Sequence, residues 1–190
     1  VDPKTGDVLA MVGSRDSFDT VHEGTFHIAT THRQPGSSFK PFVYATAFKK
    51  GYTPDTVLFD LPTEFNPLCT SSGEPTAGVD KDKCYHPQNF DSKFRGPVTL
   101  REALAQSVKT LYLAGLTDSL ATARDFGITS LNDPARYGLT LVLGGGEVSL
   151  LELVSAYSVF ANDGVRNPYR YILKIEDAGE KQILQVILDE

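Results

Sequence analysis

The 190-residue sequence predicts an α+β domain, and three observations support this fold class. The β-branched and aliphatic run at 8–12 is typical of a strand, several segments between 37 and 161 have helical spacing, and two alternating segments follow at 170–175 and 181–188. Strands on both sides of a run of helices favour α+β over an alternating parallel-sheet fold. We expect one domain, in which the terminal strands pair in a common sheet.

The first helix is placed by a proline. Residues 14–36 carry no periodic pattern, and Pro41 lacks the N–H that a helix interior needs, so a helix that contains it must begin close to Ser37. The stretch 42–48 is apolar around most of the helix circumference, and Gly51 is a stop signal. The sequence therefore predicts a central, buried helix with a serine at its start.

A long loop is predicted at 54–97, where turn-forming residues dominate. The only two cysteines, Cys69 and Cys84, lie within it. Two cysteines cannot form a structural zinc site alone, and none of the four histidines has a paired ligand spacing. A disulfide in an oxidising compartment and two unlinked thiols are both open interpretations.

The remaining helices are predicted from their start and stop signals. Two capping boxes, each a Ser or Thr followed three residues later by Glu, indicate helix starts. A shorter helix is expected at 120–126, and a turn at 177–179 joins the last two strands as a hairpin. The first capping box is Thr99 with Glu102, and the apolar spacing after it predicts one continuous helix over 100–114. The second is Ser149 with Glu152, which precedes a predicted helix over 150–161.

Composition and charge exclude several function classes. The chain is 41% hydrophobic and 22% charged, which is ordinary for a globular domain. A net charge of −6 without clustered Lys or Arg argues against a nucleic-acid partner. No segment has the roughly 18 consecutive apolar residues of a membrane span. Because the sequence starts without Met and ends on an apolar segment, we interpret it as an excised piece, with any targeting segment or anchor outside it.

The strongest chemical signal is Ser37-Ser38-Phe39-Lys40. A serine hydroxyl is a poor nucleophile at neutral pH, so acyl transfer requires a base beside it and donors for the oxyanion. Positions i and i+3 share a helix face, so the Lys40 amine can reach the Ser37 hydroxyl, and the helix start supplies free N–H groups. Taken alone, Ser-x-x-Lys is more often a capping serine with a surface lysine.

The flanking residues change this interpretation. Arg33-Gln34-Pro35-Gly36-Ser37-Ser38-Phe39-Lys40-Pro41-Phe42 closely resembles the active-serine segment of class A penicillin-binding proteins. The segments 1–10, 94–105 and 139–164 also resemble parts of that family's transpeptidase domain. The resemblance implies a penicillin-binding/serine β-lactamase-like transpeptidase fold, a helical core against a mainly antiparallel sheet, of which residues 1–190 form an incomplete part.

The family uses three motifs, and the resemblance is incomplete in two of them. The second motif is Ser-x-Asn, but Ser107 is followed by Val108-Lys109, as if a few residues were missing. The resemblance implies a loop here that turns the serine toward the nucleophile, in place of the continuous helix over 100–114 that spacing alone predicts. We expect Ser107 to be a proton-relay residue, the alternative being a serine on a helix surface. The third motif is Lys-Thr-Gly on a late strand. Lys4-Thr5-Gly6 precedes the nucleophile and is better interpreted as a surface turn.

The resemblance implies a bacterial, extracytoplasmic D,D-transpeptidase that cross-links peptidoglycan stem peptides ending in D-Ala-D-Ala through an acyl-enzyme on Ser37. It also implies inhibition by β-lactam antibiotics, which acylate the same serine. We expect no cofactor and no metal; Gly144-Gly145-Gly146 lacks the Gly-Lys-Ser/Thr of a phosphate loop and is interpreted as a turn. Two alternatives stay open, namely a D,D-carboxypeptidase or β-lactamase-like hydrolase, and a catalytically inactive penicillin-fold binding module.

Overall fold

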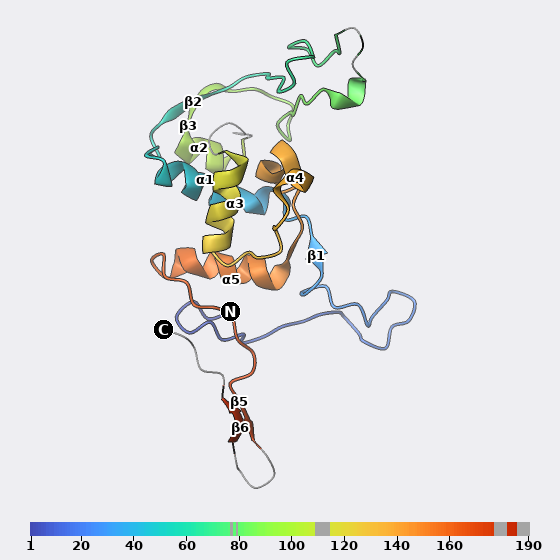
Figure 1. Ribbon diagram of the computed structural model, residues 1–190, viewed down its shortest axis with the longest axis vertical. Helices are drawn as coiled ribbons and strands as arrows, with labels where there is room; N and C mark the ends of the chain where they lie inside the picture. The colour runs from blue at the N-terminus through green and yellow to red at the C-terminus, as the bar shows by residue number, and fades with distance from the viewer. Residues whose placement is uncertain (77, 79, 109–114, 177–181, 186–190) are drawn as a thin grey trace. The chain divides into compact units, whose positions relative to one another are not determined.

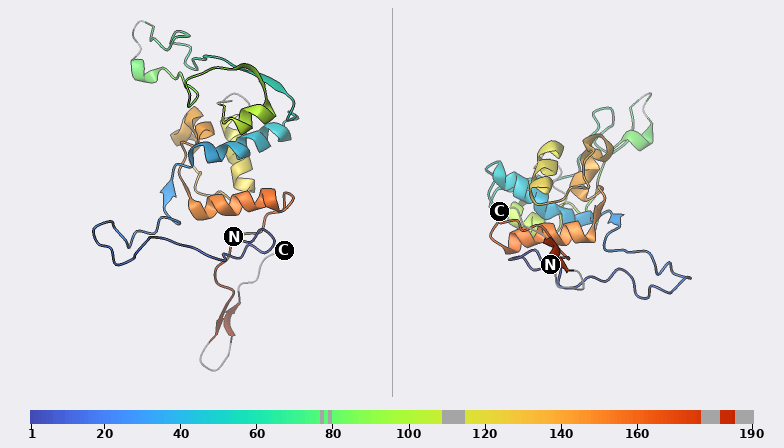
Figure 2. Two further views of the ribbon diagram at one scale, coloured as in Figure 1. Left: turned by 180° about the vertical axis from the view of Figure 1, so that it is seen from behind. Right: turned by 60° about the horizontal axis from the view of Figure 1, so that its bottom comes forward.

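The computed structural model describes residues 1–76, 78, 80–108, 115–176 and 182–185. It contains both helices and strands, as an α+β sequence requires (Figure 1 and Figure 2). The helical segments are η1 Gly36–Phe39, α1 Lys40–Lys49, η2 Lys81–Lys83, α2 Leu100–Ala105, α3 Leu116–Asp125, α4 Pro134–Tyr137, η3 Gly138–Leu143 and α5 Leu150–Ala161. The strands are β1 His32–Arg33, β2 Val57–Asp60, β3 Gly96–Thr99, β4 Val148–Ser149, β5 Lys174–Glu176 and β6 Gln182–Gln185.

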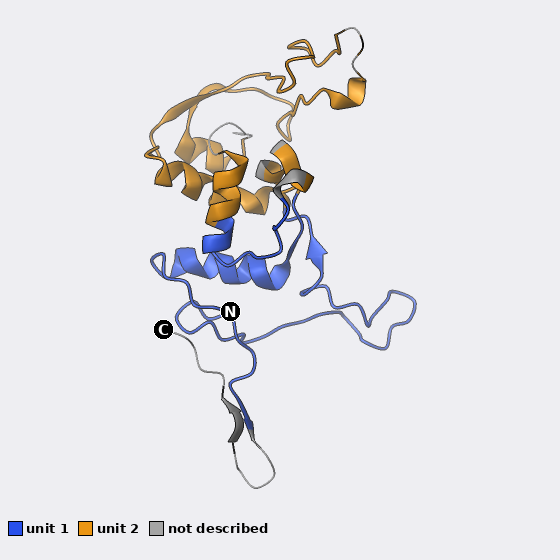
Figure 3. Cartoon of the chain, viewed as in Figure 1, with its two compact units in different colours: residues 1–35, 123–133, 146–190 blue, residues 36–122, 134–145 orange. Residues whose placement is uncertain are grey.

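The chain divides into two compact units (Figure 3). Unit 1 consists of Val1–Pro35, Ala123–Asp133 and Gly146–Glu190, and unit 2 consists of Gly36–Thr122 and Pro134–Gly145. Unit 2 contains all three predicted site residues, Ser37, Lys40 and Ser107. The expectation of a single domain stays a prediction.

The core of unit 2 forms around α1, the helix predicted after Ser37. Gly51 follows this helix with φ 93, as its stop signal requires. Phe39, Phe42 and Ala47 have no exposed surface, which agrees with the predicted burial. Helix α1 packs against β3 and α2 through one apolar cluster. The cluster comprises Tyr44, Ala47, Val98, Leu100, Ala103 and Val108, with Leu58 and Leu104 at its edge.

The predicted loop at 54–97 is partly a strand pair. Strands β2 and β3 run antiparallel, with Val57 opposite Thr99 and Asp60 opposite Gly96 (Figure 1). Strand β3 was not predicted because Gly96-Pro97 has the composition of a turn. A proline, which has no backbone N–H to donate, is tolerated in β3 because this strand pairs with no strand other than β2 within the described residues.

Unit 1 departs from the predicted sheet. The expected strand at 8–12 is not formed; within the described residues Asp7 makes a single bridge to Arg170, and Val8 N donates to the Arg170 carbonyl at 2.9 Å. The strands of the described chain form three separate two-stranded sheets, so the expectation of a common sheet was wrong. High β propensity describes fit to a half-buried pleated surface, and residues 9–12 are exposed. The predicted terminal hairpin is present as antiparallel β5 and β6, while its turn at 177–179 lies outside the described residues.

Both predicted capping boxes are confirmed. In α5, which spans the predicted 150–161, Glu152 is buried, and its carboxylate accepts from the backbone N–H groups of Thr129 at 3.0 Å and Ser149 at 3.2 Å. Burial acts to raise the pKa of the Glu152 carboxyl, but these hydrogen bonds outweigh it and lower the pKa. None of the helices in the described ranges has the length and apolar character needed to cross a membrane.

Candidate active site

Ser37 lies in an anchored turn at the start of α1. The short helix η1 leads without interruption into α1, and Pro41 occupies the first turn, where its missing N–H costs no hydrogen bond. Phe39 is fully buried, and its ring lies 5.6 Å from that of Phe42. Ser37, two residues before Phe39, is exposed. The turn is therefore held by an apolar anchor while the serine hydroxyl remains accessible.

Lys40 is the buried lysine of the site. Its residue exposure is only 5%, and its Nζ donates to Ser107 Oγ at 2.8 Å and to the Ser107 backbone carbonyl. A buried amine nitrogen needs oxygen acceptors in place of water, and Ser107 supplies two of them. The structure thus joins Lys40 directly to Ser107 and places Ser37 one turn earlier on the same helical segment. The expected approach of Lys40 to the Ser37 hydroxyl stays a prediction.

Ser107 reaches Lys40 because α2 ends before it, as the family resemblance implies, so the continuous helix that spacing alone predicts over 100–114 is interrupted. Helix α2 ends at Ala105, and Ser107 has φ 55, in the left-handed region. The Ser107 N–H donates to Leu104 O at 3.0 Å, and the Val108 N–H donates to Ala103 O at 2.8 Å. This is the hydrogen-bond pattern of a Schellman turn. Periodicity failed here because an apolar residue just past a helix can be buried by folding back, as Val108 is.

The Ser107 turn is supported from behind by a polar network that sequence analysis missed. The Arg95 guanidinium donates from Nε to Gln106 Oε1 at 2.8 Å, next to Ser107 in the chain. The Arg95 backbone N–H donates to the buried carboxylate of Asp60 at 3.0 Å. The amide of Asn89 donates to the same carboxylate at 2.8 Å. The available signal was a set of polar residues around 89–106, but no local pattern relates Asp60 to them.

Other predicted features are resolved as follows. Lys109, after Ser107, lies outside the described residues. Lys4-Thr5-Gly6 forms a turn, as expected, in which the Gly6 N–H donates to the Asp2 carbonyl at 2.8 Å. No group of three or more His, Cys, Asp or Glu side chains in the described ranges is arranged to hold a metal.

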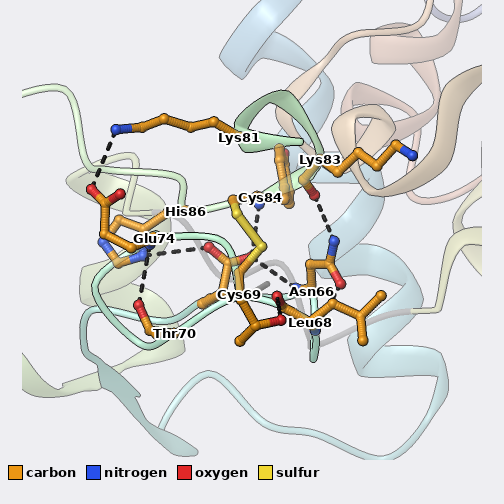
Figure 4. The surroundings of a disulfide bond; sticks show 12 residues. Asn66, Leu68, Cys69, Thr70, Glu74, Lys81, Lys83, Cys84 and His86 are labelled. Atoms are coloured by element: carbon orange, nitrogen blue, oxygen red, sulfur yellow. Dashed lines mark hydrogen bonds and ion pairs between the residues drawn. A yellow bond between two sulfur atoms is a disulfide. The ribbon is translucent and has the colours of Figure 1, made fainter. Parts of the chain in front are cut away.

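The two cysteines form a disulfide, which decides between the open interpretations (Figure 4). Cys69 and Cys84 have a Cα–Cα distance of 5.8 Å and are 15 residues apart in the chain. Closing a loop of this length stabilises a fold by about 3 kcal/mol on a chain-entropy estimate. Asn66 braces the same loop, since its side-chain amide donates to the Lys83 carbonyl at 2.8 Å.

Several known proteins are similar to this chain in sequence. A family model for the penicillin binding protein transpeptidase domain matches residues 1–124. Penicillin-binding protein 1A of Neisseria meningitidis is 39% identical over 183 residues, which cover 93% of this chain and 21% of that protein. Penicillin-binding protein 2D of Bacillus subtilis is 34% identical over 185 residues, covering 94% of this chain and 24% of that protein. The chain thus spans about a fifth of the length of these curated relatives.

Solved structures agree with the sequence relatives. The crystal structure of penicillin-binding protein 1A from Haemophilus influenzae superposes with a TM-score of 0.67 at 30% identity, covering 85% of this chain and 23% of that one. The PonA1 protein of Mycobacterium tuberculosis in complex with penicillin V gives a TM-score of 0.73 at 23% identity, covering 97% of this chain and 48% of that one, and supports the fold. The family match, the relatives and the shared fold together establish that the chain belongs to the penicillin-binding protein transpeptidase family.

Proposed function

We propose that this domain acts as a serine D,D-transpeptidase that cross-links peptidoglycan stem peptides through an acyl-enzyme on Ser37. One observation carries the proposal: the buried Lys40 Nζ lies 2.8 Å from Ser107 Oγ, one turn after an exposed serine at a helix start. A surface lysine after a capping serine has no reason to be buried, whereas a catalytic base has. Family membership supports the same reading.

The proposed reaction uses three side chains. Ser37 Oγ attacks the carbonyl carbon of the penultimate D-Ala while Lys40 Nζ, as the neutral amine, takes the hydroxyl proton. The C–N bond to the terminal D-Ala then breaks, and Ser107 relays the proton from Lys40 to the departing amine. A second stem-peptide amine attacks the ester and forms the cross-link; its proton returns to Ser37 Oγ through Lys40 as the ester C–O bond breaks.

The proposed setting is the outer face of a bacterial cytoplasmic membrane, with a membrane anchor in another part of the protein. The disulfide between Cys69 and Cys84 supports an oxidising compartment. β-Lactams are expected to acylate Ser37, because their strained amide presents the same carbonyl chemistry to the same nucleophile.

Two other functions are kept as alternatives for a specific reason. The residues after Ser107 lack the Asn of the second motif. A site with a damaged second motif fits a catalytically inactive binding module. A site in which water replaces the acceptor amine fits a D,D-carboxypeptidase or a β-lactamase-like hydrolase.

A labelling experiment tests the proposal. The parent chain and Ser37→Ala are incubated with a fluorescent penicillin, and then with a D-Ala-D-Ala peptide and an acceptor amine. Covalent label on the parent alone, with a cross-linked peptide product, supports the transpeptidase. Label with only hydrolysed peptide supports the hydrolase, and no label on either variant supports the inactive module. Label that survives Ser37→Ala would refute the choice of nucleophile.

A further inference from the structure

We propose that Gly144 is a positioning residue for Ser37. The backbone of the glycine turn at 144–146, called the seat below, contacts and supports Gly36, the residue before the nucleophile. Its catalytic consequence rests on the proposed acyl transfer at Ser37. Gly144 and Gly36 both belong to unit 2.

The two glycines touch backbone to backbone. The Gly36 N–H donates to the Gly144 carbonyl at 3.3 Å. A Cβ on Gly144 would overlap the Gly36 carbonyl oxygen and would lie 2.5 Å from the Gly36 Cα and carbonyl carbon. Real Cβ atoms essentially never come closer than 3.0 Å to another heavy atom. Any side chain at residue 144 would therefore have to push one of the two backbones away.

Gly144 is fixed in place by the end of η3. It has φ 78, its N–H donates to Leu141 O at 2.7 Å, and the Gly145 N–H donates to Thr140 O at 2.9 Å. This Schellman turn is anchored by Leu141, which has no exposed surface. The seat is thus a rigid turn held by its own hydrogen bonds and by a buried side chain.

Displacing Gly36 must displace Ser37. Gly36 is the first residue of η1, and its carbonyl carbon is bonded to the Ser37 nitrogen. The buried Phe39 fixes the far side of the same turn, so the turn cannot shift as a rigid piece. Moving a nucleophile by about 1 Å can cost roughly 100-fold in rate.

The chain offers a matched control. Gly138, at the other end of η3, also has a positive φ of 51, but a Cβ there would meet nothing within 4 Å. Gly138→Ala therefore carries the left-handed backbone cost of an alanine without a collision. Gly144→Ala carries both, so the difference between the two variants isolates the contact with Gly36.

The first measurement is acylation by a fluorescent penicillin over a range of concentrations, with thermal unfolding in parallel. We expect Gly144→Ala to lower the maximal acylation rate about 100-fold, with a smaller change in the half-saturating concentration, while Gly138→Ala acylates like the parent. If both variants acylate equally fast, the proposal is overturned.

The second measurement does not depend on acylation. Amide hydrogen exchange of Gly36 is followed in the parent and in both variants. We expect protection in the parent and in Gly138→Ala, and faster exchange in Gly144→Ala. If the parent protein shows this exchange pattern but is not labelled by penicillin, the proposed function is rejected, while the contact between Gly36 and Gly144 is still supported. An unprotected Gly36 amide in the folded parent overturns the seat, and this test holds even if Gly144→Ala does not fold.

Discussion

Two helices of unit 2, α2 and η3, end in the same kind of left-handed turn, and the residues at the turning points differ for a chemical reason. Ser107 has φ 55 and Gly144 has φ 78. In both turns the N–H groups of this residue and of the next one donate to carbonyl groups in the last turn of the helix. Glycine adopts this conformation without a steric penalty, whereas a residue with a side chain pays about 1–2 kcal/mol.

The comparison shows what each turn does for the site. At Ser107 the side chain is retained despite its cost, and its hydroxyl and carbonyl both contact Lys40. At Gly144 a side chain has no room, and the backbone alone contacts Gly36. One turn supplies a functional group, and the other supplies a surface.

The largest effect is expected when the functional group is removed. Ser107→Ala keeps the left-handed backbone but deletes the hydroxyl, so we expect acylation by penicillin to slow by roughly 100- to 1,000-fold. The control is Ser92→Ala, because Ser92 is also a left-handed serine, with φ 56, on an exposed turn. Stopped-flow acylation rates check this, and equal rates in Ser107→Ala and the parent would rule out a relay role.

The next largest effect should come from the network behind the Ser107 turn. Asp60→Ala leaves the Asn89 amide and the Arg95 N–H without their buried acceptor, which costs about 2–3 kcal/mol of stability. Asp55→Ala is the matched control, because its side chain is 84% exposed and it is expected to change stability by less than about 0.5 kcal/mol. Urea unfolding measures both, and equal midpoints for the two variants would show that the network adds nothing.

The smallest effect separates the backbone strain of the left-handed turn at Ser107 from the proposed catalytic role of its side chain. Ser107→Gly relieves about 1 kcal/mol of left-handed strain but removes one acceptor of the buried Lys40, so we expect a smaller gain in unfolding free energy than in Ser92→Gly, together with the acylation loss of Ser107→Ala. Ser92→Gly should gain the full amount, about 1 kcal/mol, with normal acylation. A Ser107→Gly variant that is less stable than the parent would mean that the Lys40 contact, rather than function, holds the serine in place.

The parts of the fold that follow local rules were predictable. Pro41 placed the start of the first helix, and the two Ser/Thr-x-x-Glu capping boxes placed the starts of α2 and α5. These signals work because a missing N–H or an uncapped helix end has the same consequence in any surroundings. The position of Ser37 and Lys40 on one turn was predictable for the same reason, whereas their proposed roles came from the resemblance of the flanking residues 33–42 to a known family.

The rest depends on contacts that are distant in the sequence. Ser107 is 67 residues from Lys40, and the burial of Val108 that ends α2 early depends on packing against α1. The seat between Gly36 and Gly144 spans more than 100 residues and leaves no periodic trace, so Gly144-Gly145-Gly146 could be identified only as a turn. The run at 8–12 has strand propensity, but propensity does not supply a partner strand.

The central claim, that Ser37 is the nucleophile of an acyl-transfer site, is tested most directly by peptide mass spectrometry after exposure to benzylpenicillin. The account predicts one penicilloyl adduct, on the peptide that contains Ser37, absent from Ser37→Ala and formed slowly in Ser107→Ala. An adduct on any other residue, or one retained in Ser37→Ala, would contradict it.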